Sequence, residues 1–593
     1  MAATAPVFAA MGVREIRAGL ASKDFSAREI AESSLARVRA LDGATHAFLE
    51  TTEQLALRQA AALDAAVAAG TLDACGPLAG VPVAFKDNMN LEGTHTTCSS
   101  AMLANYVSPF TATCVQRTIE AGGIPLGKLN MDEFAFGSST ETSAFGSTRN
   151  PWDLSRVPGG SSGGSAAAVG AGLAAITLGS DTGGSIRQPG SFCGAVAVKP
   201  TYGVVSRYGV VAFGSSLDQV GPFTRSVEDA AFALNAIAGR DVLDCTSQDL
   251  DVDFTANLAE GVKGMRIGVV PAFMEAQGLT DEVKAKVEEA VEHLRALGAD
   301  IVEVELPNAQ AAMSAYYVLG PCEAFSNLAR FDSVRYGYCD PGHKDLGGQY
   351  EASRAKGFGP EARRRIMLGS YLLSAGVYDT YYYPAQQVRT LITQDYARAY
   401  EQVDCIVAPV SPRTAFTFGE VSDPTDMYLS DMFTISINIA GNGGMSLPVG
   451  LGAQTQLPVG VQLISPQFKD QNMLRVAAAL ETVYGPAPVA PSFAGEAPAI
   501  EVAPADIPDA ADAVPGVDLP GLLAQGGSVA NDDPESRGVV GGAHQASSAA
   551  KRGLSERLGI AAAGAERGRP THRPSRTSGC RSRSSPRGRT RWP

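Results

Sequence analysis

The sequence predicts an α/β fold in which a sheet is flanked by helices, and three neighbouring patterns indicate this. Residues 265–270 have the pattern of a buried strand, and residues 301–306 have that of a second strand. Between them, residues 281–297 show the apolar periodicity of an amphipathic helix, which Gly298 terminates. A strand, a helix and a strand in succession are typical of a sheet covered by helices.

The first 60 residues are predicted to form an N-terminal helical segment. Ser26 and Glu29 have the spacing of a capping box, in which each side chain accepts a hydrogen bond from the other residue's backbone amide. Phe25 and Ile30 flank this pair at the positions of a hydrophobic staple. We expect residues 61–484 to form the main domain.

Composition excludes several classes of protein. With 593 residues, of which 45% are hydrophobic, the chain can bury a large core and is neither wholly disordered nor collagen-like. No window holds the roughly 20 consecutive apolar residues of a membrane span, and the start lacks the basic region of a secretory signal. The nine cysteines are scattered and include no C-x-x-C pair, which favours reduced thiols and a cytoplasmic location over disulfides or zinc.

The net charge of −14 combines an acidic body with an arginine-rich end that follows Lys551. An acidic body is not that of a general nucleic-acid binder. Residues 485–593 are rich first in Pro and Ala and then in Arg, without helical or strand periodicity, so we expect them to be disordered. The basic end either contacts RNA or extends beyond the functional end of the chain, and we assign no chemistry to it.

Three segments are candidates for a site. Residues 159–165 alternate Gly and Ser so densely that they indicate either a tight turn beside a ligand or a flexible linker, and the Ala-rich run 166–175, read as a helix, favours the turn. In residues 178–189, Ser185 follows a glycine-rich turn whose amides can form an oxyanion hole, unless this is an ordinary surface turn. Lys86 ends an apolar strand pattern, either as a functional amine or as a surface lysine with a packed stem.

Two common motifs do not fit. Residues 122–128 match the start of a phosphate-binding loop, but Leu129 replaces the magnesium-binding Ser or Thr, and Pro125 lacks an amide donor. Residues 159–163 match the nucleophile elbow of α/β hydrolases, but residues 150–153 before them read as a loop rather than a strand. Of the six histidines, His343 alone remains as a downstream base, so a Ser-His-Asp triad is poorly supplied.

Without a histidine, Lys86 is the candidate general base. At the ordinary lysine pKa of about 10.4, less than about 0.1% of the amine is neutral at pH 7. Burial and nearby amide dipoles can lower that pKa by several units. A serine between the lysine and the nucleophile then completes the path of the proton.

Together these segments resemble the amidase signature family over roughly residues 10–485. The resemblance implies the amidase signature fold, an α/β fold with a central mixed sheet covered by helices on both faces. It implies a Ser-Ser-Lys triad in which Ser185 is the nucleophile, Ser161 is a bridging serine that follows a cis peptide bond, and Lys86 is the base. The oxyanion hole would comprise the amides of Thr182, Gly183, Gly184 and Ser185.

Within that family, residues 127–134, 199–203, 215–219 and 326–332 are similar to the glutaminase subunits of tRNA-dependent amidotransferases. This resemblance implies that the chain releases ammonia from glutamine without a cofactor or metal of its own. A partner B subunit would use ATP and Mg²⁺ to amidate misacylated Glu-tRNA(Gln) or Asp-tRNA(Asn), and a small C subunit would complete a heterotrimer.

The same resemblance implies a glutamine pocket in which Arg365 binds the α-carboxylate, Asp431 binds the α-ammonium and Tyr316 lines the site. Three adjacent arginines leave the register of Arg365 open by one residue, and an exposed basic helix face is the alternative. For Asp431 the alternative is a helix cap or a surface acid. Two other functions stay open: a stand-alone amidase for small or aryl amides, and an inactive scaffold for partner subunits.

Overall fold

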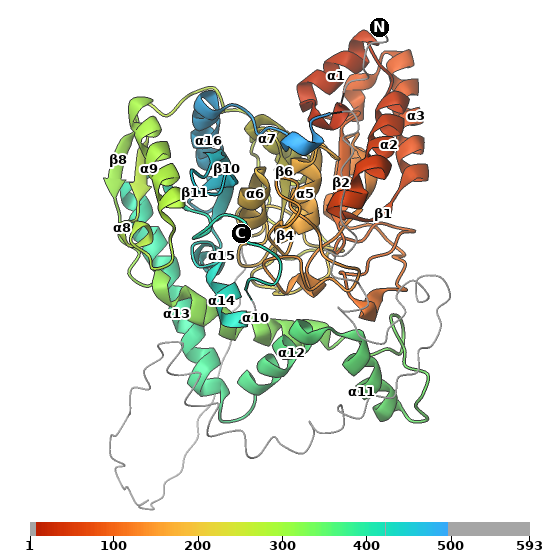
Figure 1. Cartoon of the computed structure of the whole chain (residues 1–593), viewed down its shortest axis with the longest axis vertical. Helices are drawn as coiled ribbons and strands as arrows, with labels where there is room; N and C mark the ends of the chain where they lie inside the picture. The colour runs from red at the N-terminus through yellow and green to blue at the C-terminus, as the bar shows by residue number, and fades with distance from the viewer. Residues whose placement is uncertain (1–6, 422, 496–593) are drawn as a thin grey trace, which may run out of the picture. The chain divides into compact units, whose positions relative to one another are not determined.

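The computed structural model describes residues 7–421 and 423–495 (Figure 1). The predicted disorder of residues 485–593 therefore lies, from residue 496 on, outside the described residues. Residues 485–495 pack on the body: Phe493 is buried, and the Arg37 guanidinium donates to the carbonyls of Phe493 and Gly495. No helix of the described part is both long and apolar enough to cross a membrane.

An eleven-stranded mixed sheet runs through the described residues, in the order β1-β3-β2-β4-β6-β5-β10-β11-β9-β7-β8. Strand β2 is parallel to β3 and β4, and β7 is parallel to β8 and β9, whereas the central strands pair antiparallel. The strands are β1 (Phe48–Thr51), β2 (Pro82–Lys86), β3 (Ile124–Leu129), β4 (Ile176–Asp181), β5 (Val196–Lys199), β6 (Gln219–Thr224), β7 (Arg266–Val269), β8 (Asp300–Glu303), β9 (Cys405–Pro409), β10 (Gly443–Leu451) and β11 (Pro458–Ser465).

Helices cover both faces of this sheet, as the family fold implies. Along β9, Cys405 and Val407 belong to one hydrophobic cluster, whereas Ile406 and Ala408 belong to another. The first cluster includes α9 and α16, and the second includes α10, α13 and α15. The helices are α1 (Val13–Ser22), α2 (Ala27–Thr45), α3 (Glu53–Ala69), α4 (Thr113–Glu120), α5 (Gly163–Gly170), α6 (Arg187–Cys193), α7 (Val227–Ile237), α8 (Pro271–Met274), α9 (Asp281–Ala296), α10 (Ala312–Leu328), α11 (Leu346–Gly357), α12 (Pro360–Leu372), α13 (Tyr378–Gln402), α14 (Pro424–Leu429), α15 (Ile435–Ala440) and α16 (Asp470–Tyr484).

The β-α-β prediction is confirmed. Strands β7 and β8 pair in parallel and are joined through α9, whose Val283, Val287, Val291 and Leu294 are all buried. The capping box is also confirmed: the Glu29 amide donates to Ser26 Oγ at 3.1 Å, and the Ser26 amide donates to Glu29 Oε2 at 2.7 Å. The N-terminal segment 1–60 holds α1, α2 and the start of α3, but also β1, which joins the edge of the sheet.

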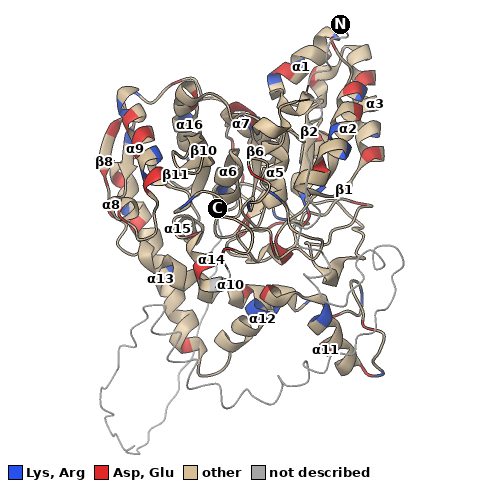
Figure 2. Cartoon of the chain, in the orientation of Figure 1, with Lys and Arg blue, Asp and Glu red and all other residues tan. Residues whose placement is uncertain are grey.

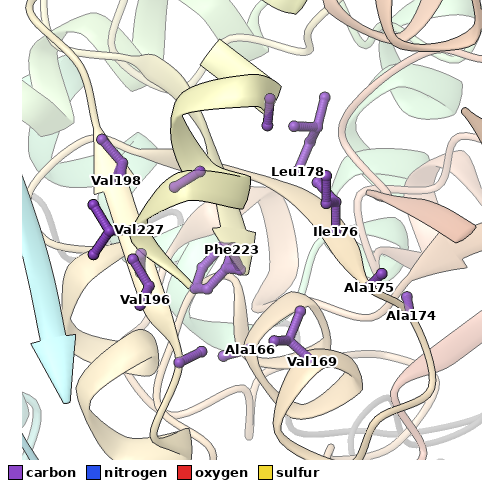
Figure 3. Close-up of a cluster of buried hydrophobic side chains, with 14 of the residues drawn as sticks. Ala166, Val169, Ala174, Ala175, Ile176, Leu178, Val196, Val198, Phe223 and Val227 are labelled. Atoms are coloured by element: carbon purple, nitrogen blue, oxygen red, sulfur yellow. The ribbon is translucent and has the colours of Figure 1, made fainter. Parts of the chain in front are cut away.

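The Ala-rich run forms less helix than its composition suggests. Helix α5 ends at Gly170, and Gly172 has a positive φ of 63°, so the chain turns before it enters β4. Ala166 and Val169 of this helix pack beside Ile176 and Leu178 of β4 and Phe223 of β6 (Figure 3). This apolar layer supports two glycine-rich loops, one that precedes α5 and one that follows β4.

Candidate active site

The sheet brings the three candidate catalytic residues to one place. Lys86 is the last residue of β2, and Ser185 lies in the loop between β4 and α6. Because β2 and β4 are adjacent and parallel, their carboxyl ends meet at the same edge of the sheet. Ser161 lies in the loop before α5, and the amide of the next residue, Ser162, donates to the Ser185 carbonyl at 3.2 Å.

The Lys86 amine is fully buried and faces hydroxyl groups. Its Nζ donates to Ser161 Oγ at 2.7 Å, to Ser162 Oγ at 2.9 Å and to the Ser180 carbonyl at 3.3 Å. Burial lowers the pKa of Lys86 to about 7, although the charges of nearby aspartates, Asp132 first, oppose the shift. A large fraction of this amine is therefore neutral near pH 7, so it can accept a proton.

The peptide bond between Gly160 and Ser161 is cis, as the family resemblance implies for a bridging serine. Asp132 leaves no room for a side chain at Gly160, because a Cβ atom there would lie 2.0 Å from Asp132 Oδ2. The same carboxylate accepts from the Thr140 amide at 2.9 Å, and the Asp132 amide donates to the Ser161 carbonyl at 3.2 Å. Asp132 thus holds the loop that presents Ser161 to Lys86.

The loop of Ser185 is organised by a buried ion pair. The Asp181 carboxylate accepts from the Gly184 amide at 2.9 Å and the Ile186 amide at 3.1 Å, and two Arg187 nitrogens donate to it at 3.0 Å each. Burial alone would raise the pKa of Asp181, but the Arg187 guanidinium holds it at about 2. The carboxylate therefore stays charged and fixes the turn before the candidate nucleophile.

This contact modifies the expected oxyanion hole. The Gly184 amide donates to Asp181 and so does not point at a substrate. Within the described residues, the amides of Thr182, Gly183 and Ser185 have no hydrogen-bond acceptor. These three donors belong to the same loop as Ser185, a residue that is 9% exposed, and they remain available to a developing oxyanion.

The loop glycines allow neighbouring side chains to approach closely. A Cβ atom on Gly183 would lie 2.8 Å from the Tyr316 ring, and one on Gly184 would lie 2.4 Å from Thr434 Oγ1 and 3.0 Å from Asp431 Oδ1. Tyr316 of α10 and Asp431, which follows α14, thus lie directly against the loop that holds Gly183 and Gly184.

Asp431 has one unsatisfied oxygen. Its Oδ2 accepts from Ser138 Oγ at 2.5 Å, whereas its buried Oδ1 has no partner among the described residues. Burial raises the pKa of Asp431 to about 7. An unpaired buried carboxylate oxygen is costly, and an incoming ammonium group would satisfy it.

Of the three adjacent arginines on α12, only Arg365 is buried, at 4% exposure, whereas Arg363 and Arg364 are exposed. Arg365 is therefore not part of an exposed basic face, and its burial favours it over Arg363 and Arg364 as the arginine of the pocket. Burial raises the pKa of Asp431, and the positive charge of Arg365 acts in the opposite direction. The two oppositely charged side chains are therefore close enough to interact. A cavity of about 420 Å³ is lined by both Arg365 and Ser138, although not by Asp431, Tyr316 or Ser185.

The sequence reasoning missed several of these contacts. Asp181 and Arg187 stand six residues apart in the same glycine-rich stretch as Ser185, and that spacing could have suggested an ion pair around the turn. Ser138 and Ser162 gave no comparable signal, because short polar side chains in a loop have many uses. Within the described residues, no cluster of three or more His, Cys, Asp or Glu could hold a metal ion.

Known proteins are similar to this chain over most of its length. Residues 29–474 match the family model described as Amidase. The chain belongs to the amidase signature family. This amidase is 51% identical over 470 residues to the A subunit of the glutamyl-tRNA(Gln) amidotransferase of Synechococcus sp. (strain JA-3-3Ab), and the match covers 79% of this chain and 91% of that protein.

Two further relatives of this amidase extend the match. The A subunit of the glutamyl-tRNA(Gln) amidotransferase of Gloeobacter violaceus is 52% identical over 487 residues, which covers 82% of this chain and 99% of the relative. The crystal structure of the corresponding protein from Thermotoga maritima has a TM-score of 0.67 and 41% identity, covering 81% of this chain and 98% of that chain. The family and fold inferred from the sequence are therefore confirmed.

For this amidase we predict that kcat/KM for glutamine rises with pH and levels off above an apparent pKa of about 7. The reason is that Lys86, with a pKa lowered to about 7, must lose its proton to act as a base. Asp431, with a pKa raised to about 7, must also be deprotonated to bind an ammonium group. Ammonia release measured between about pH 5.5 and 9.5 checks this. A midpoint above about pH 9 contradicts it.

A second prediction concerns the Gly183→Ala variant. The added methyl group would meet the Tyr316 ring at 2.8 Å, so the loop must shift and misplace the amide donors around Ser185. We expect kcat to fall about 100-fold, as for the loss of one oxyanion donor. Gly43→Ala on α2 is the matched control, because a Cβ atom there meets nothing within 4 Å. Equal activity of the two variants would show that the loop does not hold the oxyanion.

Proposed function

We propose that this chain is the glutaminase subunit of a glutamyl-tRNA(Gln) amidotransferase, with misacylated Asp-tRNA(Asn) as the alternative acceptor. It hydrolyses glutamine and supplies ammonia for transamidation of the tRNA by a partner subunit. The names of the similar proteins support this assignment. The contact that supports the chemistry is the 2.7 Å hydrogen bond between the buried Lys86 amine and the Ser161 hydroxyl, beside the loop of Ser185.

The reaction follows from these positions. Ser185 Oγ attacks the side-chain amide carbon of glutamine, while its proton passes to Ser161 and the Ser161 proton passes to Lys86. The negative oxygen of the tetrahedral intermediate is held by the amides of Thr182, Gly183 and Ser185. Lys86 returns a proton through Ser161 to the leaving nitrogen, which departs as ammonia. Water then hydrolyses the acyl-enzyme by the same proton path.

The substrate class rests on the opposite charges of the pocket. Arg365 is proposed to bind the α-carboxylate and Asp431 the α-ammonium of glutamine, with Tyr316 lining the site. A neutral small or aryl amide would leave the buried Asp431 Oδ1 without a partner and would make no use of the charge of Arg365, which argues against a stand-alone amidase for such substrates. A silent scaffold has no need of a buried amine that contacts a serine hydroxyl.

The partners are assigned by the same proposal. A B subunit would bind ATP and Mg²⁺ and amidate the tRNA, and a small C subunit would complete a heterotrimer in the cytoplasm. The lysine of the phosphate-loop-like segment is unsuited to nucleotide binding here, because Lys128 lies in β3 and its buried amine pairs with Asp87 at 2.8 Å. We therefore assign no nucleotide to this chain.

Ser185→Ala is predicted to abolish glutamine hydrolysis while the assembled complex still amidates tRNA from added ammonium chloride. The variant removes only the nucleophile, so the transamidation step of the partner remains intact. Ammonia release and amidated tRNA, measured separately, check this division of labour. Failure of ammonium to restore transamidation would show that the two reactions are not divided between subunits.

Arg365→Ala is predicted to raise the KM for glutamine at least about tenfold and to change kcat/KM for acetamide less than about twofold, because acetamide has no carboxylate. Arg363→Ala is the matched control, since Arg363 is an exposed arginine on the same helix. Steady-state kinetics with both amides provide the test. Equal losses with glutamine and acetamide would remove Arg365 from the pocket.

A further inference from the structure

Glu361 is the residue that holds Arg365 in place. It lies in the first turn of α12, where its side chain is 12% exposed, and its Oε1 accepts from Arg365 Nε at 2.6 Å. Its second oxygen pairs with Arg364. Among the described residues, Glu361 is the only carboxylate within ion-pair distance of Arg365. Helix α12 carries acidic and basic groups close together at this point (Figure 2).

The Glu361 carboxylate also contacts the segment that holds Asp431. Tyr428 of α14 donates its hydroxyl proton to Glu361 Oε1 at 3.1 Å. The Asp431 amide in turn donates to the Tyr428 carbonyl at 3.2 Å, so Tyr428 belongs to the turn that presents Asp431. Glu361 therefore connects the proposed carboxylate-binding residue on one helix with the proposed ammonium-binding residue on another segment.

Two tyrosine rings also contact the Arg365 guanidinium. Arg365 Cζ lies 4.7 Å from the Tyr317 ring centroid and 4.6 Å from that of Tyr428, and these two rings stack at 3.9 Å. Glu361 occupies the Nε edge of the guanidinium, so a substrate carboxylate must approach the two terminal nitrogens. The cavity of about 420 Å³ is lined by Glu361, Arg365 and Tyr428 together.

Glu361 also sets the charge that a substrate meets. Arg365 alone beside Asp431 would present one positive and one negative charge. Glu361 also pairs with Arg364, but that side chain is 49% exposed, so water screens its charge. Glu361 therefore partly cancels the field around the buried Arg365, and an anionic ligand gains less than it would from an unpaired arginine. A zwitterion is affected less, because its ammonium group offsets its carboxylate.

We propose that Glu361 is a positioning and specificity residue that makes the pocket prefer a zwitterionic amide, such as glutamine, over an anionic amide that lacks the amino group. This inference rests on the proposed glutaminase function and identifies what selects its substrate. Glu361 touches Arg365 and Tyr428 and acts through them.

The test compares three amides: glutamine, acetamide and glutaramate, which is glutamine without its amino group. Ammonia release is measured with the full chain assembled with its partner subunits. Glu361→Gln retains an oxygen that can accept from Arg365 Nε but removes the negative charge. Glu361→Ala removes both. Glu351→Gln, at an exposed position of α11, is the matched control.

In Glu361→Gln, we expect the ratio of kcat/KM for glutaramate to kcat/KM for glutamine to rise about tenfold. In Glu361→Ala, the KM for glutamine should rise about tenfold, while kcat/KM for acetamide changes less than about twofold. Glu351→Gln should leave all three values unchanged. A purely structural role would lower the rates with all three amides together and would not change their ratio.

An unchanged ratio in Glu361→Gln, or equal losses with the three amides in Glu361→Ala, overturns the inference. The proposed function itself would be overturned by a different result, in which the unsubstituted complex shows no higher kcat/KM for glutamine than for acetamide. The two failures are therefore distinguishable in one set of measurements. A melting temperature for each variant identifies any that does not fold, and Glu361→Gln, which keeps the size of the side chain, then decides the result.

Discussion

Burial of the Lys86 amine with no carboxylate at ion-pair distance among the described residues is the constraint around which the site is arranged. The described residues contain two other fully buried lysines. Lys128 is ion-paired with Asp87 at 2.8 Å, and Lys199 donates to Gln219 Oε1 at 2.8 Å and to backbone carbonyls. Lys86 instead contacts the hydroxyls of Ser161 and Ser162 and a backbone carbonyl. Hydroxyl contacts satisfy an amine in either protonation state, whereas a carboxylate at ion-pair distance would favour the charged form. This difference separates Lys86 from Lys128. The serine hydroxyls separate it from Lys199, because a hydroxyl can pass on a proton, whereas the amide and carbonyl oxygens that Lys199 contacts carry none.

The aspartates near Lys86 affect how easily its amine becomes neutral. Asp132 and Asp181 lie close enough for their charges to raise the pKa of Lys86, and the effect of Asp132 is the larger. Asp181 is paired with Arg187, which offsets much of its effect. Asp181 uses its oxygens to fix the turn before Ser185. One buried ion pair thus both shapes the nucleophile loop and limits the negative field at the base.

The sequence predicted the chemistry of the site better than its geometry. Glycine-rich turns and a lysine at the end of an apolar strand are local patterns, so Lys86, Ser161 and Ser185 could be found without coordinates. The β-α-β unit and the capping box at Ser26 are equally local, and both are confirmed. Contacts between distant segments could not be predicted in this way, because no local pattern shows that Glu361 meets Tyr428 or that Ser138 meets Asp431. The engagement of the Gly184 amide by Asp181 was missed for a related reason, since composition shows a donor but not its direction.

The protonation state of Lys86 can be measured directly. Lysine labelled with ¹³C at Cε gives a resonance for each side chain, and loss of one signal in a Lys86→Met variant identifies that of Lys86. We predict that this resonance titrates with a midpoint of about 7, because burial lowers the pKa of Lys86 to that value. A midpoint above about 10, the ordinary range of lysine, would contradict the account, because the amine would then be charged whenever the enzyme works.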